Sequence, residues 1–207
     1  LGSFEDAAKQ ALDLLIELDK LNIKIDFIDM GGGLGVNYLG EETPQPFELI
    51  QSYENIFEGR NETLILEPGR SISANAGIML AKVEYKKNNF IITNAAMNDL
   101  LRPALYDAHH DIWPVVKNDS PASNVNVVGP ICETGDFLAK DINIAASEND
   151  LLAVRTVGAY GSVMSSNYNS RPRAAEVLVD KKNFYLIRKR EDNSSLTSLE
   201  EGLDDQI

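Results

Sequence analysis

Three consecutive glycines, Gly31, Gly32 and Gly33, form the segment of the sequence best suited to binding a phosphate group. They follow a short apolar run at residues 25–30. Because glycine has no Cβ and tolerates a positive φ, backbone N–H groups at such a turn can surround an anion. A tight turn between a strand and a helix is an equally good interpretation of these glycines alone. The spacing matches neither the Walker pattern nor Gly-x-Gly-x-x-Gly, which argues against ATP and dinucleotides.

A second segment places a carboxylate and a guanidinium on either side of a turn: Glu67, Pro68, Gly69 and Arg70. The segment follows an apolar run at residues 63–66 and therefore lies at the end of a predicted strand. Taken alone, it could be a surface turn. In a barrel of alternating strands and helices, however, successive strand ends share one rim. Together with the glycines, this segment predicts a site for a phosphorylated cofactor that needs an acidic partner.

The second half of the chain contains further side chains suited to binding and proton transfer. Arg102 and Tyr106 place a guanidinium and a phenol four residues apart, and Cys132 precedes Glu133 in a turn-rich stretch. Tyr160 lies in a Gly-Ala-Tyr-Gly segment. Each has a purely structural alternative, such as a surface arginine, a half-buried tyrosine or a cysteine in the core. Acidic neighbours make the core interpretation of the cysteine the weaker one.

The two histidines are adjacent, His109 and His110, and the chain has no other histidine. Neighbouring histidines on an irregular segment lack the spacing of metal ligands, so we predict no metal site.

Residues 164–173 are too polar for a strand and too aromatic for an ordinary linker. We expect this tract to line a site or an interface.

The order of the apolar segments predicts two domains, with the boundary after residue 77. Residues 1–77 read as helix, strand, helix, strand, which is typical of a parallel α/β unit. In residues 78–207, apolar-rich runs flank short Lys- and Asn-containing turns twice, at residues 86–89 and 181–183. These are signatures of β-hairpins, so we expect a mainly antiparallel β domain of the sandwich or barrel type.

Composition excludes several classes of function. The 207 residues are 43% hydrophobic and 25% charged, which suits one or two globular domains. A net charge of -13 argues against binding to nucleic acid or to an anionic membrane. No apolar run approaches the ~20 residues that span a bilayer, and the first residues lack the features of a signal peptide. With Cys132 as the single cysteine, we expect a soluble protein in the reducing cytoplasm.

Taken together and in this order, the segments resemble the diaminopimelate decarboxylase family, which belongs to the fold group of alanine racemase and ornithine decarboxylase. The resemblance covers nearly the whole chain. It rests on five short motifs and one longer tract, at residues 29–35, 67–70, 102–106, 132–136, 158–161 and 164–173.

The resemblance implies an α/β plus all-β fold: the last part of a (β/α)8 barrel that binds pyridoxal 5'-phosphate, followed by a C-terminal antiparallel β domain. It also implies an activity, the decarboxylation of meso-2,6-diaminopimelate to L-lysine and CO2. By the same resemblance, Gly31 to Gly33 and Arg70 would surround the cofactor phosphate, and Pro68 and Gly69 would also bind the cofactor. Glu67 would face the pyridine nitrogen.

Substrate contacts follow from the resemblance as well. Arg70, Arg102 and Tyr106 would hold a substrate carboxylate and Glu133 the distal ammonium group. Diaminopimelate carries both groups at its far end, whereas ornithine and lysine carry only the ammonium, so this set of partners favours diaminopimelate.

Three further implications concern the cofactor, the reaction and the assembly. Tyr160 would contact both the cofactor and the substrate. Cys132 would protonate the carbanion left when CO2 departs. In this family Cys132 and Glu133 reach into the partner subunit's site, so the resemblance implies a homodimer with shared active sites.

One family feature has no counterpart in the sequence. The family binds its cofactor as a Schiff base to a lysine of the first barrel strand, and no lysine here matches that position. We therefore expect these 207 residues alone to be inactive. Two alternatives remain: a polyamine-type decarboxylase of the same fold, against which Arg102 argues, and a non-catalytic or regulatory chain of that fold.

Overall fold

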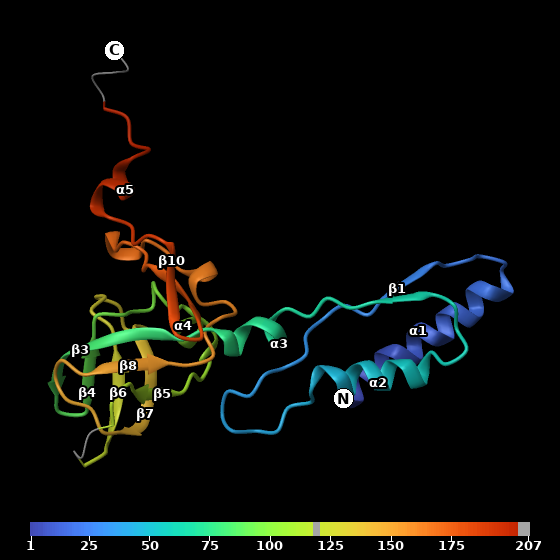
Figure 1. Ribbon diagram of the computed structural model, residues 1–207, viewed down its shortest axis with the longest axis horizontal. Helices are drawn as coiled ribbons and strands as arrows, with labels where there is room; N and C mark the ends of the chain where they lie inside the picture. Colours follow the sequence, from blue (N-terminus) through green and yellow to red (C-terminus); the bar gives the residue numbers. More distant parts are fainter. Residues whose placement is uncertain (118–120, 203–207) are drawn as a thin grey trace. The chain divides into compact units, whose positions relative to one another are not determined.

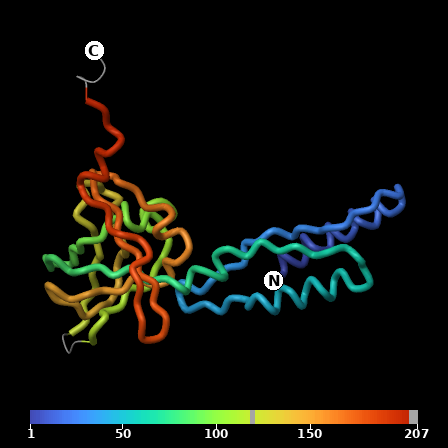
Figure 2. The backbone as a smooth tube through the Cα atoms, turned by 45° about the horizontal axis from the view of Figure 1, so that its top comes forward, coloured from blue at the N-terminus to red at the C-terminus, as the bar shows by residue number. Residues whose placement is uncertain are grey.

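The computed structural model describes residues 1–117 and 121–202 and divides the chain into two compact units (Figure 1). The N-terminal unit is Leu1–Ala76, and the C-terminal unit begins at Gly77. This division falls one residue before the boundary expected from the sequence. The same two units can be followed in the backbone trace (Figure 2).

The N-terminal unit alternates helices and strands. Its elements are α1 (Gly2–Lys20), β1 (Phe27–Asp29), α2 (Pro46–Ile56), β2 (Thr63–Ile65), α3 (Arg70–Ser73) and the short 3-10 helix η1 (Ala74–Ala76). Strands β1 and β2 pair in parallel. Helix α2 starts where Pro46 presets the first turn and Glu48 accepts the N–H of Gln45 at 2.6 Å. This is the element order that the apolar periodicity predicts.

The core of the N-terminal unit lies where both helices meet the strands. Ala8 of α1 and Leu49 and Tyr53 of α2 are buried together with Leu34, which follows the three glycines. Because Leu34 is buried in this cluster, the glycine segment is anchored at its C-terminal side.

The C-terminal unit is built on a six-stranded sheet with strand order β5-β8-β3-β4-β6-β7. The strands are β3 (Met79–Lys87), β4 (Phe90–Thr93), β5 (Ile112–Pro114), β6 (Ser123–Val128), β7 (Phe137–Ile144) and β8 (Leu151–Val154). Strands β4 and β6 pair in parallel, and the other neighbours are antiparallel.

The expectation of an antiparallel domain is therefore wrong for β4 and β6, and the sheet is mixed. After β4 the chain forms the short helix α4 (Arg102–Tyr106) and the edge strand β5, and then returns as β6 to pair with β4. A connection of this length can return a strand in the same direction, which a hairpin cannot do.

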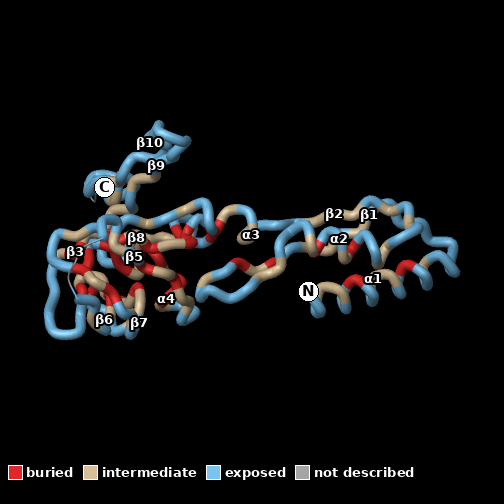
Figure 3. Tube along the Cα trace, turned by 60° about the horizontal axis from the view of Figure 1, so that its bottom comes forward, coloured by how far each residue is buried: buried red, intermediate tan, exposed pale blue. Residues whose placement is uncertain are grey.

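The sheet curls towards a barrel. Its two edge strands, β5 and β7, contact each other, and α4 packs against β7. Apolar side chains from all six strands of this sheet fill the interior, and Val83, Ile91 and Leu152 are fully buried there. The buried stretches of backbone are red in Figure 3.

The remaining elements follow β8. They are the 3-10 helices η2 (Ser162–Met164) and η3 (Tyr168–Ser170), strands β9 (Glu176–Asp180) and β10 (Asn183–Arg188), and helix α5 (Asn193–Thr197). Strands β9 and β10 form an antiparallel hairpin whose residues are mostly exposed (Figure 3). Both predicted hairpins, β3 with β4 and β9 with β10, are confirmed. In the described part of the chain, no helix has the length and apolarity to cross a membrane.

Replacing Leu152 with alanine should destabilise the C-terminal unit by about 2–5 kcal/mol, because a fully buried side chain of the central strand β8 is lost and leaves a cavity. The neighbouring Leu151→Ala is the matched control. Leu151 is 45% exposed, and its loss should change the free energy of unfolding by less than about 1 kcal/mol. Urea unfolding followed by the fluorescence of Trp113, the single tryptophan, measures both. Equal losses in the two variants would contradict this core assignment.

Candidate functional site

The glycine segment and the Glu67–Arg70 segment lie directly against each other in the N-terminal unit. The N–H of Glu67 donates to the carbonyl of Gly31 at 2.8 Å. A Cβ on Gly32 would lie 2.1 Å from the carbonyl oxygen of Glu67, so no side chain fits there. Gly31 and Gly33 have positive φ values of 66° and 93°. The structure thus brings the two predicted phosphate-binding segments together and requires glycine in the first.

Two buried hydrogen-bond donors at the start of the helix after Gly69 have no partner among the described residues. Arg70 opens α3, and its Nε is buried without a hydrogen-bond partner, as is the hydroxyl of Ser71. Glu67, Pro68 and Gly69 are exposed. Because buried donors normally have partners, the Nε of Arg70 fits a site whose missing acceptor is an anion. These observations fit the phosphate of pyridoxal phosphate.

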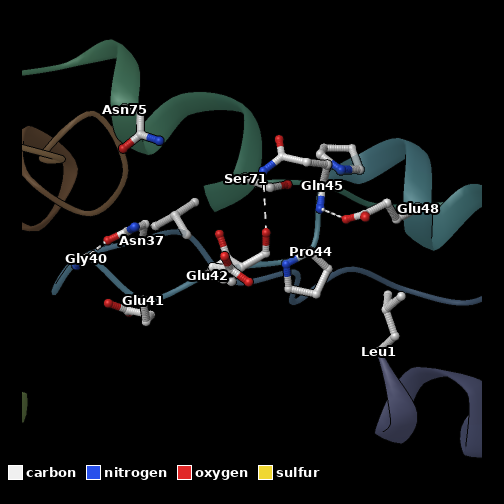
Figure 4. Close-up of a pocket in the computed structure, with 14 residues that line it drawn as sticks. Leu1, Asn37, Gly40, Glu41, Glu42, Pro44, Gln45, Glu48, Ser71 and Asn75 are labelled. Carbon is white, nitrogen blue, oxygen red and sulfur yellow. Dashed lines mark hydrogen bonds between the residues drawn. The ribbon is translucent and has the colours of Figure 1, made fainter.

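The N-terminal unit also has a cavity of about 730 Å³, which other residues line (Figure 4). Glu41, Glu42 and Glu48 contribute carboxylates to its wall, and none of the predicted site residues lines it. Ser71, which directly follows Arg70 in the sequence, is one of the lining residues (Figure 4). Its acidic lining disfavours a phosphate inside it.

In the C-terminal unit, the structure brings together Arg102 and Tyr160. Arg102 is the first residue of α4 and only 8% exposed, and its guanidinium carbon lies 5.9 Å from the centre of the Tyr160 ring. An aromatic ring at this distance attracts the cation through its electron-rich face. The contact joins two residues that are 58 positions apart in the sequence (160 minus 102).

Tyr160 is held in a strained turn. Its φ of 61° is uncommon for a residue with a bulky side chain. The next residue, Gly161, permits the turn, since a Cβ there would lie 2.4 Å from the carbonyl oxygen of Val157. Strain of this kind persists only where surrounding contacts fix it, and here it fixes the position of a half-exposed phenol.

His110 lies beneath Arg102 and is a site residue that the sequence interpretation missed. Its Nε2 is 3.0 Å from Nη1 of Arg102, and its Nδ1 is 2.9 Å from the carbonyl oxygen of Arg155. Burial, assisted by the nearby guanidinium, lowers the pKa of His110 and favours a neutral ring. From the sequence, both histidines are considered only as metal ligands. Among the described residues, no group of three or more His, Cys, Asp or Glu side chains is arranged to share a metal ion.

Cys132 and Glu133 are exposed on a loop that Asp136 organises. The buried carboxylate of Asp136 accepts the N–H groups of Ile131 at 2.8 Å and Met97 at 2.7 Å. Burial raises the pKa of Asp136, whereas these two hydrogen bonds act in the opposite direction. These hydrogen bonds hold the backbone of the loop in place, while the side chains of Cys132 and Glu133 remain accessible.

Glu133 is linked to the polar tract at residues 164–173. Its carboxylate accepts the N–H of Thr134 at 2.8 Å and the hydroxyl of Tyr168 at 3.3 Å. Tyr106, at the end of α4, is exposed. The described contacts thus form two groups, Arg102 with Tyr160 and Glu133 with Tyr168.

The arginines of the polar tract hold it to the rest of the C-terminal unit. Arg171 donates to the side chain of Asn98 at 2.8 Å, and Arg173 forms an ion pair with Glu191 at 3.0 Å. These two side chains support the tract that carries Tyr168.

A family model described as "Pyridoxal-dependent decarboxylase, C-terminal sheet domain" matches residues 12–158. The chain therefore belongs to the family of pyridoxal-dependent decarboxylases. Among curated proteins it is 50% identical to the diaminopimelate decarboxylase of Vibrio cholerae over 208 aligned residues, which cover 98% of this chain and 50% of that protein. It is 52% identical to the diaminopimelate decarboxylase of Pseudomonas aeruginosa, with 92% of this chain and 47% of the relative covered.

A solved structure gives the same result. The diaminopimelate decarboxylase of Helicobacter pylori, complexed with L-lysine, superimposes with a TM-score of 0.90 at 40% identity. That comparison covers 99% of this chain and 51% of the other. The chain spans about half the length of the curated relatives it matches.

Replacing Gly32 with alanine should weaken the binding of pyridoxal phosphate at least tenfold, because the new Cβ displaces the Glu67 carbonyl and opens the contact between the two segments. Gly35→Ala is the matched control, since a Cβ at Gly35 meets no atom within 4 Å. Titration of the cofactor into the complete polypeptide, followed by its visible absorbance, measures the affinity. Equal affinities for the two variants would contradict the assignment of the contact between Gly32 and Glu67 to the cofactor phosphate site.

Proposed function

We propose that this chain is the C-terminal half of a diaminopimelate decarboxylase, which converts meso-2,6-diaminopimelate into L-lysine and CO2. The observation that carries the proposal is the 50% identity to the Vibrio cholerae enzyme along 98% of the chain. The pairing of a buried arginine with a half-exposed tyrosine supports it, since a substrate with a second carboxylate needs a cation at its far end.

In this proposal the N-terminal unit is the last part of a (β/α)8 barrel and holds the cofactor. Gly31 to Gly33, with Pro68, Gly69 and Arg70, would bind the phosphate. Glu67 would hold a proton on the pyridine nitrogen. Bound there, pyridoxal phosphate supplies an electron sink for the carbon that loses CO2. The support for this assignment is the close contact of Gly32 with Glu67 and the buried, unpartnered Nε of Arg70.

The C-terminal unit would supply the substrate-binding groups. Arg102 would bind the distal carboxylate, and Tyr106 and Tyr160 would donate hydroxyl hydrogen bonds to the substrate. A guanidinium that is largely removed from water interacts more strongly with a carboxylate than an exposed one does. Glu133 would bind the distal ammonium group. The hydrogen bond from the Tyr168 hydroxyl would fix the Glu133 carboxylate.

Cys132 would donate the proton that replaces CO2. Its thiol is exposed on the Asp136-anchored loop and is therefore available to a ligand outside its own fold. We propose that it acts in the site of a partner subunit, which makes the enzyme a homodimer with two shared sites. The lone cysteine supports a cytoplasmic location for this dimer.

The complete polypeptide should release CO2 from diaminopimelate and act at least about a hundredfold more slowly, in kcat/KM, on ornithine, arginine and carboxynorspermidine, because only diaminopimelate satisfies both Arg102 and Glu133. The 207-residue chain by itself should be inactive in the same assay, since it has no lysine at the position that binds the cofactor. Preference for ornithine or carboxynorspermidine would indicate a polyamine-type enzyme. Absence of any decarboxylation by the complete polypeptide would indicate a non-catalytic protein.

Cys132→Ala should lower kcat by about 10²–10⁴-fold while the cofactor absorbance stays unchanged, because the thiol delivers a proton and does not bind the cofactor. Thr134→Ala, on the same exposed loop, is the control and should retain wild-type kcat.

Mixing Cys132→Ala subunits with Arg70→Ala subunits tests the sharing of sites. If Cys132 acts in the partner's site, half of the dimers are mixed and each has one intact site, which restores about a quarter of the wild-type activity. No recovery on mixing, under conditions where subunits exchange, would place Cys132 in its own subunit's site.

A further inference from the structure

We propose that His110 is a positioning residue: its neutral imidazole fixes the direction of the Arg102 guanidinium through Nε2, while Nδ1–H anchors the ring to the end of β8. The proposal deepens the proposed function, on which it rests only in assigning Arg102 to the substrate carboxylate.

The two ring contacts of His110 select one tautomer. The carbonyl oxygen of Arg155 can only accept a hydrogen bond, so the nitrogen 2.9 Å from it, Nδ1, carries the proton. Nη1 of Arg102 can only donate, so the nitrogen 3.0 Å from it, Nε2, presents a lone pair. A neutral ring protonated on Nδ1 satisfies both contacts at once. A ring protonated on Nε2 would place two donors against each other.

The anchor point of the ring is itself rigid. Arg155 directly follows β8, and its N–H donates to the carbonyl of Asp111 at 2.8 Å. Its guanidinium carbon stacks 3.8 Å from the centre of the Trp113 ring on β5. The carbonyl that receives Nδ1–H therefore belongs to a residue held from both its backbone and its side chain. The position of His110 is consequently set by the sheet.

Arg102 needs such an anchor because its own element is small. Helix α4 has five residues, too few to fix a long side chain by itself. The guanidinium meets Tyr160 on one side and His110 on another. His110 is 1% exposed, so water does not compete freely for its lone pair. The chain of contacts runs from the sheet through Arg155 and His110 to the guanidinium.

Three substitutions separate the two hydrogen bonds of His110. His110→Phe removes both hydrogen bonds. His110→Asn retains a donor near the position of Nδ1, and His110→Gln retains an acceptor for Arg102 near the position of Nε2. In the complete polypeptide with pyridoxal phosphate bound, we expect His110→Phe and His110→Asn to raise KM for diaminopimelate about tenfold or more, with kcat within about threefold of wild type. His110→Gln should restore KM to within about threefold of wild type.

His109→Phe is the matched control. His109 is the adjacent residue of the same type, contacts Asp111 at 3.1 Å and is only part-buried. His109→Phe should leave the KM for diaminopimelate unchanged. If His110 only stabilised the segment between α4 and β5, His110→Asn would retain function better than His110→Gln. The rise in KM would then be proportional to the loss of thermal stability. Either that order, or an unchanged KM in a folded His110→Phe enzyme, overturns the proposal.

A spectroscopic measurement tests the geometry independently of activity. In the ¹⁵N NMR spectrum of the histidine-labelled wild type, the ring signals that His110→Gln removes should report a neutral imidazole protonated on Nδ1 at neutral pH. A ring protonated on Nε2, or on both nitrogens, overturns the proposal even if diaminopimelate is turned over. Conversely, a wild type that fails to decarboxylate diaminopimelate but shows the Nδ1-protonated ring overturns the proposed function and supports the positioning role.

Discussion

The C-terminal unit depends on accommodating a buried cation. Arg102 is only 8% exposed as a residue, so its charged group loses hydration and must recover that free energy from acceptors and aromatic faces. Arg102 obtains them from His110 and from the ring of Tyr160. Both partners come from segments that the sheet holds in place, His110 before β5 and Tyr160 in the strained turn after β8. The architecture of the unit therefore serves to bring these two segments to one arginine.

Local sequence rules predicted the features that depend on neighbouring residues. The two hairpins were predictable because Asn88 and Lys181 sit in turns between apolar runs, and both adopt positive φ. The need for glycine at positions 31 and 33 was predictable for the same reason. The motifs also singled out Arg102 and Tyr160 as predicted site residues, and in the structure these two side chains contact each other.

Features that depend on pairing between distant segments could not be derived in this way. The parallel pairing of β4 with β6 follows from a long crossover whose direction no local pattern specifies. From the sequence, His110 is considered only as a metal ligand and set aside for lack of ligand spacing, whereas its contact with the carbonyl of Arg155, 45 residues later, could not be read from its neighbours. Asp136 belongs to the motif at residues 132–136. That its carboxylate holds the Cys132 loop in place follows only from the hydrogen bonds it accepts from the N–H groups of Met97 and Ile131.

The crossover between β4 and β6 also bears on how the protein folds. Strand β4 cannot complete its pairing until the chain has passed through α4 and β5 and returned as β6. Non-local pairings of this kind are formed slowly, because the closure entropy of the loop must be overcome before any contact compensates for it. The crossover is also the segment that carries Arg102 and His110. Completion of the sheet and assembly of the arginine site are therefore one folding event, so a chain with an unfinished sheet also lacks an ordered site.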